Sequence, residues 1–467
     1  MTRFTPGREA EDVNPDPAIF KAYDIRGLHG SEMDETTAKA IGRAFARVLG
    51  RLRGKEPGEL RVGLGRDMRL TAPAMAGAVR DGLVAEGATV VDAGQIATEM
   101  LYHLVGSRPL DGGAMVTASH NPKAYTGVKL VREGALPLSG DAGIGEVKAE
   151  IEAGLGEAPG GGSVEEVEVW DEFHAHALSF IDPSNVKPMR VVVDGGNGMG
   201  GPMVGPILEK LPLELEEMYF VPNGEFPDHE PNPLLEENRR MIIDRVRSSG
   251  ADLGIAWDGD ADRCFFIDGN GTFCDGDFVC ALLARSVLRK NPGATILYDP
   301  RSSRAVPDLV AAEGGRSDLS RVGHAFFKAR MREEEAAFGG EVSGHYYFRD
   351  FWNADSGTIP ALLMLELLSK DGRTIGELMA EFRSKYFISG EINSEVADGQ
   401  AKMQELEEKF SDGEITHVDG VSVDYPDWHF NVRPSNTEPL LRLCLESLVS
   451  REDMESKRDE VLSLIRG

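Results

Sequence analysis

A serine with a histidine beside it stands where an apolar stretch of the chain ends. Thr117-Ala118-Ser119-His120-Asn121-Pro122 follows the apolar residues 114–116, so the Ser119 hydroxyl is expected at the end of a buried strand. Pro122 stiffens the backbone, as suits a group that must be held still while it reacts. Serine is a weak nucleophile without a base or a metal nearby, so other parts of the chain must supply partners. The same six residues are also good turn formers, and the motif alone does not decide between the two roles.

Three carboxylates alternate along one short loop after a second apolar stretch. Asp258-Gly259-Asp260-Ala261-Asp262-Arg263 follows the apolar segment 253–257. Like charges so close together repel unless a hard cation neutralises them, and oxygen ligands suit Mg²⁺. An EF-hand is excluded, because Arg263 occupies the sixth position and Gly269 the twelfth. We therefore predict a magnesium site, with a solvated acidic turn as the alternative.

Two further polar loops have side chains suited to a phosphorylated sugar. Gly339-Gly340-Glu341-Val342-Ser343-Gly344-His345 offers a carboxylate, a hydroxyl and an imidazole, and a carboxylate can accept bonds from two sugar hydroxyls. Arg433-Pro434-Ser435-Asn436-Thr437-Glu438-Pro439 combines a bidentate cation, two hydroxyls and an amide, which suit an anion. It lacks the lysine and glycines of a nucleotide P-loop. Each loop by itself could equally be a capped turn.

Basic residues stand near these loops in the sequence. Lys129 follows Ser119 by ten residues, close enough for a hairpin to bring it back. Arg26 precedes a glycine that permits a tight turn, while Arg301 and His324 stand in stretches that precede the 339–345 loop. A single such residue is usually an ordinary surface charge, but together they are candidates for binding phosphate.

A glycine-rich stretch offers a competing interpretation. Gly195-Gly196-Asn197-Gly198-Met199-Gly200-Gly201 contains GxGxxG after an apolar segment, with Glu214 near the distance of a ribose-binding acid. Any tight turn from strand to helix can recruit glycines, however, and Pro202 and the short run before Glu214 argue against a dinucleotide site. An NAD-dependent dehydrogenase stays as an alternative.

The spacing of apolar residues predicts the elements that must position these loops. It predicts helices at 34–54 (capped by Asp34), 72–86 and 141–155, and strands at 61–67 and 89–92. Strands alternating with helices point to parallel sheets covered on both faces. Predicted strands that lead into a loop begin at residues 61, 190 and 294. They recur about once per domain, which suggests a repeated fold. From about 387 the pattern changes to a helix at 397–410, strands around 420–432 and a helix from 451 capped by Ser450.

These patterns divide the chain into four domains. The glycine-rich linker 156–163 marks the first boundary. The predicted domains are 1–160 with the serine loop, 161–271 with the aspartate loop, 272–386 with the 339–345 loop, and 387–467 with the 433–439 loop.

Composition excludes several classes of protein. The chain has 467 residues, is 41% apolar and carries a net charge of −28, which argues against nucleic acid or anionic membranes as partners. The polar N-terminus indicates neither signal peptide nor anchor, and the sequence contains no span long enough for a membrane. Four cysteines without a CxxC pair indicate a reducing, cytoplasmic setting.

In this order, the four loops resemble those of the α-D-phosphohexomutase superfamily, and most of all its phosphomannomutase/phosphoglucomutase group. The resemblance runs from about Phe20 to Glu438, and four ordered motifs are more specific than GxGxxG alone. It implies an α/β fold of four domains around a central cleft, the first three with similar mixed sheets and the fourth a smaller α+β domain.

The resemblance also implies a role for each loop. Ser119 would carry the phosphoryl group and, with Asp258, Asp260 and Asp262, hold one Mg²⁺. Glu341, Ser343 and His345 would contact the sugar. Arg433, Ser435, Asn436 and Thr437 would bind its phosphate. Arg26, His120, Lys129, Arg263 and His324 fall at phosphoryl-contacting and proton-transfer positions. Arg301, also a substrate-binding candidate, departs from the lysine expected there, so its role is less certain.

The implied reaction interconverts hexose 1-phosphates and 6-phosphates, of mannose and also glucose, through a hexose 1,6-bisphosphate that turns round in the site. A lysine acting as the base would need its pKa lowered, which neighbouring cations could do. Val342 replaces the Gln associated with phosphoglucosamine mutases, which favours mannose and glucose. The alternatives are a phosphoglucosamine mutase, a metal-dependent sugar phosphatase and a non-catalytic sugar-phosphate binder. We expect a monomer or weak homodimer whose partners are small hexose phosphates.

Overall fold

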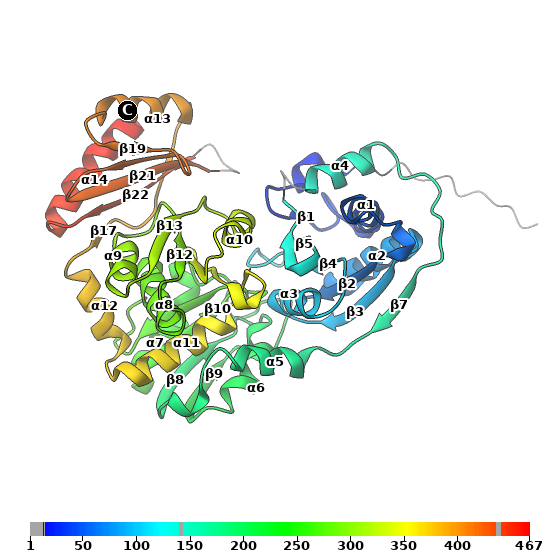
Figure 1. Ribbon diagram of the computed structural model, residues 1–467, viewed down its shortest axis with the longest axis horizontal. Helices are drawn as coiled ribbons and strands as arrows, with labels where there is room; N and C mark the ends of the chain where they lie inside the picture. The colour runs from blue at the N-terminus through cyan, green and yellow to red at the C-terminus, as the bar shows by residue number, and fades with distance from the viewer. Residues whose placement is uncertain (1–12, 14, 140–142, 436–439) are drawn as a thin grey trace, which may run out of the picture.

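The computed structural model describes residues 13, 15–139, 143–435 and 440–467. Four β-sheets follow one another along this part of the chain (Figure 1). The first three mix parallel and antiparallel strand pairs, whereas all pairs of the fourth are antiparallel. This confirms the predicted fold class of three mixed α/β sheets and a smaller α+β domain. Within the described residues, no helix combines the length and apolar character needed to cross a membrane.

The first sheet carries the serine loop. Its strand order is β1-β5-β4-β2-β3-β7, and β6 pairs with β5. The buried strand β4 ends just before the serine loop, and its antiparallel partner β5 places Lys129 opposite Met115, which confirms the expected hairpin. The elements are η1 (Pro17–Ile19), β1 (Ile25–Leu28), α1 (Glu35–Arg53), η2 (Pro57–Glu59), β2 (Arg61–Arg66), α2 (Ala72–Ala85), β3 (Thr89–Gln95), α3 (Thr98–Ser107), β4 (Gly112–Val116), β5 (Tyr125–Arg132), η3 (Glu133–Ala135), β6 (Leu136–Pro137), α4 (Ile144–Glu152) and β7 (Ser163–Glu166).

The second sheet carries the aspartate loop. Its order is β11-β10-β8-β9, and the loop connects the buried antiparallel strands β10 and β11. The elements are α5 (Trp170–Leu178), η4 (Pro183–Asn185), β8 (Met189–Asp194), α6 (Gly200–Leu208), β9 (Leu213–Met218), α7 (Glu236–Ser249), β10 (Leu253–Trp257) and β11 (Cys264–Asp268).

The third sheet carries the loop of residues 339–345 between β14 and β15. Its order is β13-β12-β14-β15-β16. The elements are α8 (Gly276–Lys290), β12 (Thr295–Tyr298), α9 (Ala305–Ala312), β13 (Arg316–Leu319), α10 (His324–Glu333), β14 (Phe338–Gly340), β15 (Tyr346–Phe348), η5 (Arg349–Phe351), β16 (Ala354–Asp355), α11 (Thr358–Asp371) and α12 (Ile375–Arg383).

The fourth sheet carries the start of the 433–439 loop. Its order is β17-β22-β21-β20-β19, and β18 pairs with β22. The elements are β17 (Phe387–Ile388), β18 (Ile392–Glu395), α13 (Gly399–Lys409), β19 (Glu414–Thr416), β20 (Val421–Asp424), β21 (Trp428–Pro434), β22 (Leu440–Ser447) and α14 (Arg451–Arg466).

Two helix caps that the sequence predicts are present. The Asp34 carboxylate accepts a hydrogen bond from the Thr37 N–H at 2.8 Å, and α1 begins at the next residue. The Ser450 hydroxyl accepts from the Asp453 N–H at 3.2 Å and caps α14. Both caps satisfy backbone donors that have no partner within the helix.

Glu366 on α11 fixes the segment after α5 to the third sheet's helices. Its buried carboxylate accepts from Lys290 and Lys370, both at 2.8 Å, and from the Asp182 N–H at 3.2 Å. Burial alone would raise the pKa of Glu366, but these donors lower it from 4.5 to about 2. A carboxylate with a lowered pKa contributes stability above its ordinary pKa and loses it as the pH falls towards the folded-state value.

We therefore expect Glu366→Gln to destabilise the protein by roughly 1–3 kcal/mol at pH 7, with a difference from the wild type that shrinks between about pH 4.5 and pH 2. Thermal unfolding at a series of pH values measures it, with the exposed Glu333→Gln as control. A difference that stays constant with pH would mean that the carboxylate charge does not matter.

Candidate active site

The serine predicted to carry the phosphoryl group lies in a loop that is held from both sides. Ser119 is 5% exposed and has φ +50°, a conformation seldom adopted by residues other than glycine. Its N–H donates to Thr117 Oγ1 at 2.9 Å. The buried Arg69 donates to the carbonyl oxygens of Ser119 at 2.8 Å and Asn121 at 2.6 Å. These hydrogen bonds therefore hold the backbone of the serine loop in place.

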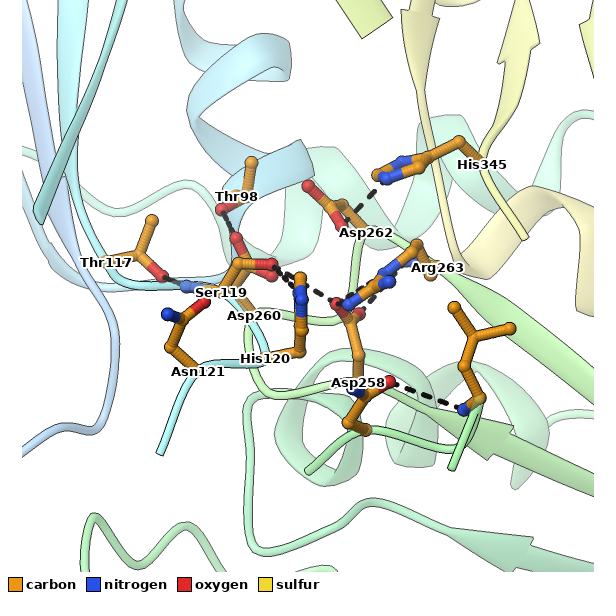
Figure 2. Close-up of polar contacts among 12 residues, drawn as sticks. Thr98, Thr117, Ser119, His120, Asn121, Asp258, Asp260, Asp262, Arg263 and His345 are labelled. Atoms are coloured by element: carbon orange, nitrogen blue, oxygen red, sulfur yellow. Dashed lines mark hydrogen bonds and ion pairs between the residues drawn. The ribbon is translucent and has the colours of Figure 1, made fainter. Parts of the chain in front are cut away.

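The Ser119 hydroxyl faces the aspartate loop (Figure 2). Its Oγ lies 3.1 Å from Nδ1 of His120 and 3.4 Å from Oδ2 of Asp258. Burial, with the positive charges of Arg263 and Arg26, lowers the pKa of His120 well below its usual value. The imidazole is therefore uncharged at neutral pH and able to accept a proton from the serine.

The three aspartates form a compact set of oxygen ligands. Asp258, Asp260 and Asp262 are all buried, and one oxygen from each lies within 4.8 Å of the others. Oδ1 of Asp260 and Oδ1 of Asp262 are buried and have no hydrogen-bond partner among the described residues. Burial and the neighbouring carboxylates raise the pKa of Asp258. Buried oxygens without donors fit a hard divalent cation such as Mg²⁺.

Lys129 and Arg263 bring positive charge to the same cluster. Lys129 Nζ lies 2.7 Å from Asp260 Oδ2 and 2.6 Å from Asp262 Oδ2, and the Arg263 guanidinium pairs with Asp258 at 2.7 Å. Burial alone would lower the pKa of Lys129, but Asp260 and Asp262 raise it well above its usual value. The charges nearest to Lys129 are carboxylates rather than cations, so this arrangement does not supply the lowered pKa that a lysine acting as the base would need.

His345 reaches the aspartates from the third sheet. Its Nδ1 lies 3.0 Å from Asp355 Oδ2 and 3.9 Å from Asp262 Oδ1. Asp355 is in turn paired at 2.6 Å with Lys328, a fully buried lysine at the end of the basic stretch 321–328. His324, one turn before Lys328 on α10, is also buried, and burial followed by the Lys328 charge lowers its pKa well below the usual value. His324 and His345 therefore lie close together, with ring centroids 6.4 Å apart, whereas His120 lies beside Ser119.

Arg26 contacts the serine loop from β1. It donates to Asn121 Oδ1 at 2.6 Å and pairs with Asp24. Arg26 therefore lies beside Asn121, the residue that follows His120, as expected for a group near the phosphoryl site.

Glu341 in the 339–345 loop is held by three donors. Its carboxylate accepts from the Gly323 N–H, the Ser343 hydroxyl and the Tyr347 hydroxyl, each at 3.0 Å. Arg301 lies 3.7 Å from it, and its guanidinium is bound by Asp299 at 2.8 and 2.9 Å. The Glu341 carboxylate is thus fixed beneath the loop, and the Ser343 hydroxyl that it holds belongs to a residue lining a cleft.

That cleft has a volume of about 640 Å³ and lies between the second, third and fourth sheets. Its lining includes Arg301, Ser343, Glu391 and Arg442. Arg433, at the end of β21, is 7% exposed and pairs with Glu391 at 3.1 Å. Ser435 lies 3.5 Å from Arg442, whereas Asn436 and Thr437 lie outside the described residues.

Residues 322 and 323 connect three domains near these loops. The Tyr23 hydroxyl donates to the Val322 carbonyl at 3.0 Å, and the Val322 N–H donates to Asp419 at 2.9 Å. The neighbouring Gly323 N–H holds Glu341. Contacts from the first and fourth domains therefore converge beside the 339–345 loop of the third domain.

The GxGxxG stretch packs against the aspartate loop. The Met199 N–H donates to the Gly259 carbonyl at 2.9 Å, and a Cβ at Gly198 would approach that carbonyl oxygen to 2.5 Å. Glycine is needed at this position because the backbones of two loops touch. This need produces the same glycine pattern that a dinucleotide-binding site has.

The four domains and the loops that meet between them define an enzyme of the phosphohexose mutase class. Family models for phosphoglucomutase/phosphomannomutase match domain I at residues 17–155, domain II at 171–271, domain III at 275–386 and the C-terminal domain at 391–464. The chain belongs to the phosphoglucomutase/phosphomannomutase family.

Individual relatives agree with this assignment. The chain is 42% identical to the phosphohexose mutases of Xanthomonas campestris over 96% of its length and 99% of theirs. It is equally similar, at 42%, to a phosphomannomutase of Salmonella montevideo over the same shares of the two chains. A crystal structure of a phosphoglucomutase/phosphomannomutase family protein from Burkholderia thailandensis matches with TM-score 0.86 and 33% identity over 97% of each chain.

Proposed function

We propose that the protein interconverts mannose 1-phosphate and mannose 6-phosphate, and the corresponding glucose phosphates, through a phosphorylated Ser119 and a hexose 1,6-bisphosphate. The observation that carries the proposal is the buried Ser119 hydroxyl, 3.4 Å from a set of three buried aspartates. A phosphoryl group on that oxygen would face both the aspartate loop and the cations around it.

Positioning and charge neutralisation account for most of the catalysis in phosphoryl transfer. Asp258, Asp260 and Asp262 would hold Mg²⁺, which when bound neutralises charge on the transferred phosphoryl group. Lys129 and Arg263 add positive charge from the protein itself. His120, uncharged and 3.1 Å from Ser119 Oγ, accepts the serine proton when Ser119 takes up the phosphoryl group and returns it when the group leaves. A second group, Lys129 or another histidine, takes the proton of the sugar hydroxyl when that hydroxyl receives the phosphoryl group and returns it in the reverse step.

The other two loops bind the sugar and its second phosphate. Glu341 and Ser343 contact neighbouring hydroxyls of the hexose, and His345 approaches from the side of the metal ligands. Arg433, with Ser435 and the residues after it, binds whichever phosphate is not being transferred. A bisphosphorylated sugar that turns round keeps these contacts, because both ends carry the same group.

A phosphorus NMR time course tests the proposal. The protein is given Mg²⁺, a trace of glucose 1,6-bisphosphate and, in separate samples, mannose 1-phosphate, glucose 1-phosphate or glucosamine 1-phosphate. Conversion of the mannose and glucose substrates to their 6-phosphates supports it. Faster conversion of the glucosamine substrate would instead indicate a phosphoglucosamine mutase, and release of inorganic phosphate without a 6-phosphate would indicate a phosphatase.

A further inference from the structure

Glu391 is a carboxylate placed among the arginines of the proposed phosphate site, where a phosphate would itself be expected to bind. We propose that Glu391 occupies these arginines in the ligand-free protein and is displaced from them by the phosphate of the substrate. The inference rests on the proposed function of Arg433 and adds two residues, Glu391 and Arg442, to that site.

Both oxygens of Glu391 are engaged. Oε2 lies 3.1 Å from Arg433 Nη2, and Oε1 lies 2.8 Å from Arg442 Nη1. Arg301 Nη1 lies 3.6 Å from Oε2. Two oxygens shared between guanidinium groups reproduce part of the arrangement that a phosphate offers to arginines.

Arg442 is built into the same surface as Arg433. The two residues are direct partners on the antiparallel strands β21 and β22, and Arg442 Nη2 lies 3.5 Å from Ser435 Oγ. The Nε atoms of both arginines are buried and have no hydrogen-bond partner among the described residues. Glu391 therefore satisfies only part of the donors that these side chains offer.

The charges are also only partly balanced. Arg301 already has its own partner in Asp299, so that among the described residues only the carboxylate of Glu391 pairs with Arg433 and Arg442. A phosphate monoester carries about −1.5 to −2 charges at pH 7 and matches two guanidinium groups better than one carboxylate does. The phosphate and Glu391 would repel each other at this distance, so both cannot keep the same contacts.

The position of Glu391 allows it to withdraw. It follows Gly390, which has φ +68°, in the short segment between β17 and β18, and its side chain is 27% exposed. The side chain can therefore turn towards water without leaving a charge in the core. Arg301 belongs to the third domain, whereas Arg433 and Arg442 belong to the fourth. Withdrawal of Glu391 would therefore also remove one contact between these two domains.

Glu391→Gln tests the inference, because the amide keeps the shape and removes the charge. The control is Glu395→Gln, the same change at an exposed residue on the strand that follows Glu391, β18. Two quantities are measured for each protein: the inhibition constant of inorganic phosphate against mutase turnover, and the rise in melting temperature that inorganic phosphate causes. The second does not depend on turnover.

We expect the Glu391→Gln variant to bind inorganic phosphate about fivefold more tightly than the wild type does, and its KM for the hexose phosphate to be lower by a similar factor. The reason is that the partly exposed ion pairs between Glu391 and the arginines no longer compete with the phosphate. Glu395→Gln should match the wild type. Unchanged or weaker phosphate binding in Glu391→Gln would overturn the inference and leave Glu391 as a residue that only positions the arginines. An absence of turnover in the wild type would instead refute the proposed function, and the melting temperatures would still decide on Glu391.

Discussion

Ser119→Ala is expected to lower turnover by about 10⁴-fold or more, because the oxygen that would carry the phosphoryl group is lost. The other hydroxyl in the loop, Thr117 Oγ1, accepts the Ser119 N–H and is part of the scaffold that orients the loop. The serine loop should keep its conformation in this variant, because Arg69 binds main-chain carbonyl groups that alanine also has. Turnover and the transfer of labelled phosphate from glucose 1,6-bisphosphate to the protein measure the effect.

The matched control is Ser286→Ala, a buried serine on α8 away from these loops. It should leave turnover unchanged, and circular dichroism and melting temperature should show that both variants fold. If Ser119→Ala kept turnover or still became labelled, the phosphoryl carrier would be another residue.

The second large effect is expected for Asp262→Asn, which should weaken Mg²⁺ binding and lower activity about 100-fold at limiting Mg²⁺. Asp262 offers a buried Oδ1 without a partner among the described residues, and its Oδ2 lies 2.6 Å from Lys129. The amide has nearly the same volume but no charge, so it is a poorer ligand and leaves the Lys129 ammonium less well paired. Titration of activity and of binding with Mg²⁺ measures the change.

Asp318→Asn serves as the control, because Asp318 is a half-exposed aspartate on β13 whose partner is Arg330. Excess Mg²⁺ should restore part of the lost activity in Asp262→Asn and change nothing in the control. An unaltered Mg²⁺ dependence would mean that Lys129 alone satisfies these carboxylates and that the metal binds elsewhere.

The order of the loops and their places at strand ends could be predicted from the sequence. The alternation of apolar and polar residues is a local property, and it indicated the hairpin that returns Lys129 and the helix caps at Asp34 and Ser450. The three aspartates could be recognised because like charges at alternate positions of one loop call for a cation. Family resemblance then linked loops that lie far apart in the chain.

The residues that support the site could not be found in this way. Arg69 holds a carbonyl 50 residues further along the chain, and Lys328 pairs with Asp355 on another element. Arg69 belongs to no motif, and Lys328 could be noted only as one cation of the stretch 321–328, because the sequence does not distinguish a buried lysine from a surface one. Arg442 and Glu391 also escaped notice, although Arg442 is opposite Arg433 once the two strands are paired.

The sequence by itself determined the fold class and the family and indicated the candidate reactive groups, because these depend on residue type, periodicity and order along the chain. The tertiary structure decided their electrostatic states. Lys129 meets Asp260 across 131 residues, so its pKa rises, whereas a lysine acting as the base would need a lowered pKa. Charges act through space and burial removes the water that would screen them. Only the packing of the domains therefore determines which charges are close and which of them are paired.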